Sequence, residues 1–198
     1  MLKKFLRRGF TLIELLIVVA IIAILAAIAV PNFLDAQIRS KVSRVKADMR
    51  AIATAVEAYC VDNNAYPYPD NGNGVAEDPP VSDGFENHVP TRITTPISYM
   101  TSLPSEPFKE KVILDENTQY NYCDRAYFLL AGAETEFNEY VDYLIGLSPA
   151  TQYYILSHGP DLDHDDPDEG NPALYDPTNG TTSNGDILYW GPGIGYRQ

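Results

Sequence analysis

The first 31 residues, MLKKFLRRGFTLIELLIVVAIIAILAAIAVP, consist of a short basic segment followed by a long apolar run. Four basic side chains precede Gly9, and between Phe10 and Val30 the one ionisable side chain is Glu14. At a helical rise of about 1.5 Å per residue, this apolar run extends roughly 30 Å, which matches the hydrocarbon core of a bilayer. The sequence therefore predicts a membrane-spanning helix at residues 10–31.

An ordinary secretory signal is the main alternative for this segment. A basic region, an apolar region and small residues at 27–29 also fit a leader that is cut after Ala29 to release a soluble protein. The apolar run is longer than usual for such a leader, and the Glu14 carboxylate is costly in lipid without a partner. Cleavage between Gly9 and Phe10 would supply that partner, because the new amine would lie about 6 Å along the helix from Glu14.

The motif RRGFTLIELL at residues 7–16, followed by an apolar helix that ends in AVPNF at 29–33, resembles the start of type IV pilins and type II secretion pseudopilins. The resemblance implies that a prepilin peptidase removes residues 1–9 by cutting after Gly9, and methylates the new N-terminus at Phe10. It also implies that Glu14 neutralises the amine of a neighbouring subunit during filament assembly. The implied partners are further copies of this chain, minor pseudopilins and an inner-membrane assembly platform.

Beyond Pro31 the apolar run becomes a stripe typical of an amphipathic helix at residues 32–62. Apolar side chains recur at alternating steps of four and three residues, which places them on one helical face; they are Ile38, Val42, Val45, Met49, Ile52, Val56 and Tyr59. We expect the helix to end at about Asp62, because Asn63 and Asn64 follow. Pro31 removes one helical hydrogen bond, so it either bends or opens the helix or simply marks the membrane boundary.

Charge is divided unevenly along the chain. The first 50 residues hold 9 basic and 3 acidic side chains, whereas residues 51–198 hold 5 and 24. The acidic second part argues against direct nucleic-acid binding. The basic residues between 39 and 50 form either a solvated face or a stem that pairs with acidic neighbours in a filament, and only the second would make assembly salt-sensitive. Because basic residues flank the apolar run on both sides, the leader resemblance, not charge, implies a single-pass inner-membrane protein with a periplasmic head.

Residues 63–198 provide material for one modest globular domain. Residues 63–97 are rich in Pro, Gly, Asn and Asp and predict a loop. The turn LPSEP at 103–107 is similar to the Leu-Pro-x-Asp-Pro turn of the major, G-type pseudopilins, with Glu106 as its acid. Short strand-like runs follow at 126–131, 140–145, 152–157 and 186–190. We predict an α+β fold, in which a small antiparallel sheet packs on the helix stripe as in pilins.

Two cysteines, Cys60 and Cys123, could form a disulfide in the oxidising compartment that export implies. The sequence does not fix the distance between them, and two buried free thiols are the alternative.

The acidic stretch SHGPDLDHDDPDEG at residues 157–170 has the composition of a calcium loop, since clustered carboxylates suit hard cations. It is not an EF-hand, because an aspartate stands where that motif needs its turn glycine. G-type pseudopilins bind calcium between a Ser-x-Gly-x-Asp opening and a later Asp-Ile pair, and residues 157–161 and 183–187 are similar. The resemblance implies a calcium site with the candidate ligands Asp161, Asp163, Asp165, Ser183 and Asp186. A solvated acidic loop is the alternative.

The sequence favours a structural protein over an enzyme. It contains no HExxH pair, no GxSxG elbow and no Walker A loop, and we expect its histidines, His88, His158 and His164, to be solvated loop residues. The predicted function is that of a major pseudopilin, which polymerises through its N-terminal helix into a periplasmic filament that supports protein export. Two alternatives remain open: a type IV pilin of a surface filament for adhesion, motility or DNA uptake, and a membrane-anchored periplasmic enzyme or binding module.

Overall fold

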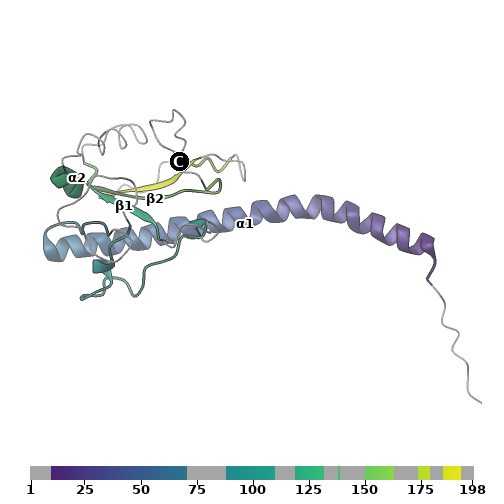
Figure 1. Ribbon diagram of the computed structural model, residues 1–198, viewed down its shortest axis with the longest axis horizontal. Helices are drawn as coiled ribbons and strands as arrows, with labels where there is room; N and C mark the ends of the chain where they lie inside the picture. The colour runs from purple at the N-terminus through teal and green to yellow at the C-terminus, as the bar shows by residue number, and fades with distance from the viewer. Residues whose placement is uncertain are drawn as a thin grey trace, which may run out of the picture. The chain divides into compact units, whose positions relative to one another are not determined.

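The computed structural model of the chain describes residues 10–70, 88–109, 119–131, 138, 150–162, 174–178 and 185–192. Within these ranges the elements are α1 (Leu12–Asn63), η1 (Thr91–Ile93), β1 (Asn121–Asp124), α2 (Arg125–Ala131), β2 (Tyr153–Ser157) and β3 (Ile187–Gly191) (Figure 1). The chain divides into two compact units, residues 1–37 and residues 38–198. The predicted α+β fold, a long N-terminal helix with a small antiparallel sheet, is confirmed.

Helix α1 ends where the sequence indicates. The Asn63 side-chain amide donates to the backbone carbonyl of Tyr59 at 2.9 Å, and Asn64 has a φ of 54°. A residue in this left-handed conformation is common directly after a helix. The helix therefore ends one residue beyond Asp62, and it is continuous through Pro31.

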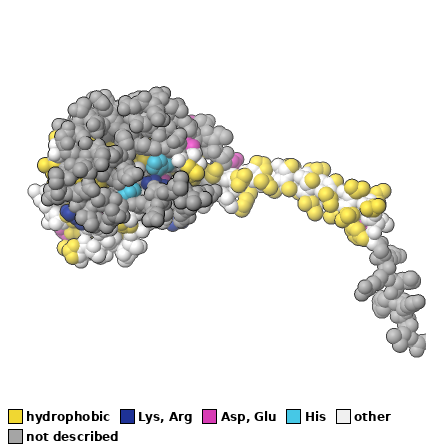
Figure 2. Space-filling model, in the orientation of Figure 1, with side chains coloured by type: hydrophobic (Ala, Val, Ile, Leu, Met, Phe, Trp, Pro, Cys, Tyr) yellow, Lys and Arg dark blue, Asp and Glu magenta, His cyan; other side chains and the backbone are white. Residues whose placement is uncertain are grey.

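The first unit is apolar on most of its described surface. All side chains from Phe10 to Leu34 are exposed, and most are Leu, Ile, Val, Phe or Ala. Figure 2 shows these hydrophobic side chains along the first part of α1. By length and composition α1 is the one helix among the described residues that could cross a membrane. So large an apolar surface needs lipid or other protein to cover it.

The second unit contains a three-stranded antiparallel sheet in the order β1-β2-β3. Tyr154 of β2 lies opposite Cys123 of β1 and Trp190 of β3, and Ser157 lies opposite Ile187. The strands predicted at 152–157 and 186–190 are thus confirmed as β2 and β3. The strand predicted at 140–145 lies outside the described residues.

The predicted strand at 126–131 is wrong, because this segment is helix α2. The Asp124 carboxylate accepts the backbone N–H of Tyr127 at 3.0 Å, as a residue that caps a helix N-terminus does. The strand lies immediately before it, at Asn121–Asp124, and all four of its residues are buried. The Asp124 cap therefore starts a helix whose later residues, 126–131, are apolar and aromatic and fit a strand equally well in the sequence.

Asp124 also makes head stability depend on pH. Burial raises the pKa of its carboxyl to about 6, against the opposing hydrogen bonds from the Tyr127 and Ala126 amides. Between about pH 4 and pH 6, Asp124 keeps a proton in the folded head that it releases in the unfolded chain, so its contribution to stability is fully present below about pH 4 and is lost as pH rises to about 6. Asp124→Asn keeps a capping oxygen and should remove up to about 3 kcal/mol of this pH-dependent loss. Urea unfolding at pH 4 and pH 8 measures the change, and an unaltered pH dependence would contradict it.

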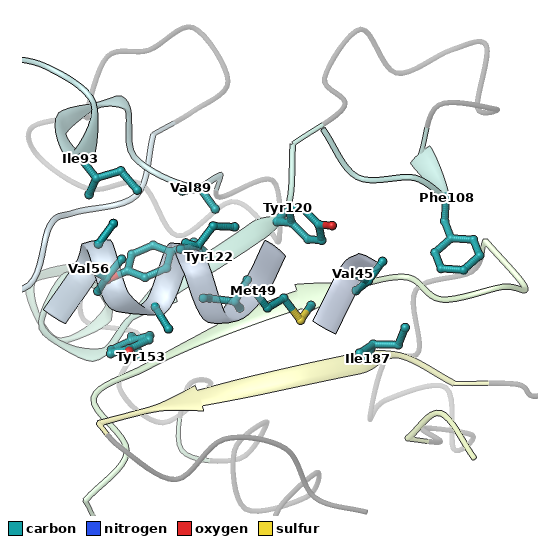
Figure 3. Packing of buried hydrophobic residues seen from close by; sticks show 14 of the residues in the cluster. Val45, Met49, Val56, Val89, Ile93, Phe108, Tyr120, Tyr122, Tyr153 and Ile187 are labelled. Atoms are coloured by element: carbon teal, nitrogen blue, oxygen red, sulfur yellow. The ribbon is translucent and has the colours of Figure 1, made fainter. Parts of the chain in front are cut away.

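The stripe on α1 forms the main core with one face of the sheet. Val42, Val45, Met49, Ile52 and Val56 are buried, and Ile38 and Tyr59 pack against them partly buried, so the predicted stripe is confirmed. Figure 3 shows Val45, Met49 and Val56 directed toward a shell of sheet and loop side chains that includes Tyr122, Tyr153 and Ile187. The opposite face of the sheet carries a second cluster: Cys123, Tyr154, Leu156, Leu188 and Trp190. Both faces of the sheet are thus covered.

The segment predicted as a loop at 63–97 is tied to the sheet at its two described ends. Asp70 and His88 exchange backbone hydrogen bonds of 3.1 and 2.8 Å, and His88 also bridges to Asn121. His88 is 5% exposed, so the expectation that it is a solvated loop residue is wrong. Its backbone pairing with Asn121, which the sequence does not reveal, places His88 beside the first residue of β1.

Cys60 and Cys123 are both free thiols in the structure, so the expected disulfide is not formed. The alternation of side chains along a strand gives the reason: Tyr122 belongs to the α1-facing core, and Cys123 belongs to the cluster on the other face. Cys60 lies on α1, whereas Cys123 lies on the face of the sheet that is turned away from α1, so the two thiols do not meet. Burial, together with the charge of Glu57, also raises the pKa of the Cys60 thiol, which lowers its reactivity.

Candidate functional site

Thr11 and Glu14 form a reciprocal cap at the start of α1. The Thr11 backbone N–H and hydroxyl donate to Oε2 of Glu14 at 2.9 and 2.7 Å, and the Glu14 backbone N–H donates to the Thr11 hydroxyl at 3.3 Å. The backbone N–H of Leu15 donates to the Thr11 carbonyl at 3.2 Å, which closes the first helical turn. This is a capping box, and it satisfies amide groups that a helix N-terminus otherwise leaves unpaired.

The capping box leaves Glu14 able to bind a further donor. Both donors of Thr11 share one oxygen of the carboxylate, Oε2, so Oε1 can accept from an amine. Phe10, whose amine the predicted cleavage would create, is described and 70% exposed, whereas Gly9 lies outside the described residues. Sequence reasoning gave Glu14 a partner amine and missed Thr11. The pattern Thr-x-x-Glu before an apolar run was the signal for it.

Where β2 ends and β3 begins, the structure brings together the described parts of the two segments that resemble a calcium loop. The Asp161 carboxylate accepts the backbone N–H of Gly185 through Oδ2 at 2.7 Å. Gly159 has a φ of 71°, and a Cβ there would lie 2.5 Å from the Gly185 carbonyl oxygen. Only glycine permits both this backbone conformation and this close approach. The loop after β2 and the segment before β3 therefore touch at one point.

Two of the five candidate calcium ligands are described. Oδ1 of Asp161 is buried and has no hydrogen-bond partner among the described residues. Asp186 is fully buried, and its carbonyl accepts the backbone N–H of Tyr175 at 3.0 Å. Asp163, Asp165 and Ser183 lie outside the described residues, and within the described ranges no three acidic, His or Cys side chains could hold one metal ion. The site therefore stays a prediction whose two anchoring segments are in contact.

Glu106, which the sequence marked only as part of a turn, is buried beside this loop. The Ser157 hydroxyl donates to Oε1 of Glu106. Burial raises the pKa of Glu106 to about 7 and the charge of Asp186 acts in the same direction, while the Ser157 hydrogen bond and the charge of Lys109 oppose the rise. A buried acid in the turn 103–107 thus lies close to a candidate calcium ligand.

Several of the basic residues between 39 and 50 have partners within the chain. The Lys41 ammonium donates to the Pro107 carbonyl at 2.7 Å, and Lys46 lies 6.0 Å from the centre of the Tyr175 ring. Arg44 and Asp48 form an exposed i,i+4 ion pair at 3.6 Å. Part of the basic face therefore stabilises the head of its own chain.

Comparisons with known proteins match a motif at the start of the chain and several pilin-like relatives. Residues 4–30 match the model of the prokaryotic N-terminal methylation motif. The type IV major pilin protein PilA of Myxococcus xanthus is 56% identical over 59 residues, which are 30% of this chain and 27% of the pilin. The type II secretion system core protein G of Pseudomonas aeruginosa is 47% identical over 64 residues, which are 32% of this chain and 45% of that protein.

A longer match reaches into the head. The type II secretion system core protein G of Escherichia coli is 28% identical over 131 residues, which are 66% of this chain and 84% of that protein. The matches to the first two relatives, by contrast, span less than half of their lengths. No solved structure matches the chain.

Proposed function

Because the chain belongs to the superfamily of type IV pilins and type II secretion pseudopilins, we propose that it is a structural subunit of a type II secretion pseudopilus. The observation that carries this proposal is the first unit, where an exposed, mostly apolar segment from Phe10 to Leu34 holds one carboxylate, Glu14, at the N-terminal cap of α1. Such a helix can lie in a bilayer and then pack against copies of itself in a filament.

The start of the helix supports processing by a prepilin peptidase. Cleavage between Gly9 and Phe10, with methylation of Phe10, would place an amine next to the capping box. That amine, from the same chain or a neighbour, would pair with Oε1 of Glu14 while Thr11 keeps Oε2. Before assembly the subunit would span the inner membrane with its head in the periplasm. Its further partners would be minor pseudopilins and the assembly platform.

The head favours a pseudopilus over a surface pilus. Core protein G of Escherichia coli matches across 66% of the chain, whereas the Myxococcus xanthus pilin matches across 30%. The type IV pilin remains the second candidate, because its 56% identity over 59 residues exceeds the 28% of that core protein over its longer match.

We propose calcium as the ligand of the loop after β2. Asp161 offers a buried carboxylate oxygen, Asp186 lies in the adjoining segment, and Asp163, Asp165 and Ser183 complete the candidate set. A bound calcium ion would neutralise an acidic segment whose like charges otherwise repel one another. The role of these residues is to close the loop against β3.

Calcium should raise the melting temperature of the head. Binding to the folded state alone adds about 2.7 kcal/mol when free calcium is 100 times the Kd, which corresponds to roughly ten degrees for a small domain. Thermal unfolding of the full chain in detergent, with chelator and with excess calcium, measures the shift. Magnesium at equal concentration is the control, and superimposable curves with chelator and calcium would remove the site.

Genetics distinguishes the two filament types. Deletion of the gene should block secretion of type II substrates while surface pili and motility persist, and the wild-type gene should restore secretion. Loss of surface pili with normal secretion would instead establish the pilin. A chain that functions fully as a monomer would contradict both.

A further inference from the structure

A network of buried polar side chains underlies the start of the loop at 157–161. Glu106 is 0% exposed and Lys109 is 7% exposed. The Lys109 ammonium donates to Oδ1 of Asn121 at 2.8 Å, and the Asn121 amide nitrogen lies 3.5 Å from Nε2 of His158. Burying charged groups costs several kcal/mol for each ion, and only close partners offset this cost. The network therefore calls for a role beyond filling space.

Glu106 holds the end of β2 in place. Its Oε1 accepts the Ser157 hydroxyl, and the backbone N–H of His158 also hydrogen-bonds to its carboxylate. The Ser157 hydroxyl oxygen in turn accepts the backbone N–H of Gly159 at 3.4 Å. One side chain from the turn at 103–107 thus fixes three successive residues of another segment.

These three residues lead directly to the point where the loop meets the segment before β3. Gly159 touches the Gly185 carbonyl, and two residues later Asp161 accepts the Gly185 N–H. A shift of Ser157 would move Gly159, and with it Asp161, away from Gly185. The position of Asp161 therefore depends on Glu106 through two hydrogen bonds.

The free oxygen of Glu106 is a separate observation. Oε2 is buried and has no hydrogen-bond partner among the described residues. The charge of Asp186 is felt at Glu106, and Lys109 supplies positive charge nearby. Two buried carboxylates thus lie beside one ammonium in this corner of the head, and a cation in the adjoining loop would favour their ionised forms.

We propose that Glu106 is a positioning residue for the calcium loop: it orders residues 157–159 so that Asp161 faces the ion, and its charge raises the affinity for a divalent cation. This inference rests on the proposed calcium site. Groups that orient metal ligands typically contribute 10- to 100-fold to metal affinity, so Glu106 should do the same here.

Calcium titration of the cleaved full chain in detergent micelles, by calorimetry after chelator treatment, tests the proposal. Glu106→Gln keeps the shape and one acceptor and removes the charge, so we expect calcium to bind roughly 10- to 100-fold more weakly. Without calcium, the melting temperature of this variant should be unchanged or higher, because a buried carboxylate is gone. A role in stability alone would lower the melting temperature and leave the calcium Kd unaltered.

Glu57→Gln is the matched control. Glu57 is half-buried and accepts the hydroxyls of Tyr153 at 3.0 Å and Tyr66 at 3.3 Å, so it also holds β2, but at the opposite end of the strand. Its calcium Kd should stay within twofold of the wild type. Ser157→Ala should also weaken calcium binding. The calcium affinity of the double variant should fall by less than the product of the two single-variant factors, because both residues act through the hydrogen bond between them.

The possible results separate the two claims. If the wild type binds calcium and Glu106→Gln binds it equally well, the charge of Glu106 does not contribute to affinity; if Ser157→Ala also binds it equally well, the positioning role is wrong and the calcium site stands. If the wild type binds no calcium, the site itself is overturned and this inference with it. Should Glu106→Gln fail to fold, Ser157→Ala decides, because an unchanged calcium Kd in that variant contradicts the positioning role.

Discussion

Glu14→Ala should be exported and cleaved normally and should form at least tenfold fewer filaments than the wild type. The proposed cleavage lies at Gly9, and the apolar run gains hydrophobicity when its one charge is removed, so membrane insertion should be unaffected. Assembly suffers because an amine that enters a helical bundle in lipid then has no counter-charge. Electron microscopy of sheared filaments, with immunoblots for the cleaved chain, measures both steps.

Glu14→Gln separates the capping role that the structure shows for this side chain from the proposed role of its charge. Glutamine at this position also completes a capping box with Thr11, so the helix start is preserved while the charge is lost. We expect Glu14→Gln to assemble as poorly as Glu14→Ala. Wild-type amounts of filament from Glu14→Gln would show that the cap, and not the charge, is what assembly requires.

Ile52→Ala should destabilise the head by about 2 to 5 kcal/mol. Ile52 is 0% exposed in the core between α1 and the sheet, so the smaller side chain leaves a cavity as well as losing its burial. Urea unfolding, followed by fluorescence of the single tryptophan, Trp190, which is 7% exposed, gives the free energy.

Ile97→Ala is the matched control for this substitution. Ile97 belongs to the same unit and is 58% exposed, so its truncation should change the free energy of unfolding by less than about 0.5 kcal/mol. Equal effects of the two variants would mean that the stripe on α1 does not carry the core.

The regular parts of the fold were readable in the sequence because they repeat a pattern. The stripe from Ile38 to Tyr59 has the period of a helix with one buried face, and two runs of apolar and aromatic residues correspond to β2 and β3. Strand β1 was missed because it is four residues long and buried on both faces, so it shows no alternation. Helix α2 was mistaken for a strand because its start depends on the single side-chain cap of Asp124.

The candidate sites also divide into features with a local sequence pattern and features that depend on contacts between distant residues. The reciprocal bonds of Thr11 and Glu14 are local in sequence and could have been predicted. The burial of Glu106 could not, since it arises when a turn packs against β2, 51 residues further along the chain. The cysteine pair failed as a prediction for a related reason, because the face of the sheet that Cys123 occupies depends on a strand register that no local pattern fixes.

One consequence of the core concerns how the head could be separated from its membrane helix. The buried stripe of α1 begins at Val42 and forms the core together with Tyr122, Tyr153 and Ile187. A protease that cuts before Ile38 would leave this stripe with the sheet, so we expect it to release a folded head. A cut between Val42 and Val56 divides the core itself, and the fragment that carries the sheet then exposes its aromatic face to water. Helix α1 therefore both anchors the subunit in the membrane and contributes one side of the hydrophobic core of the head.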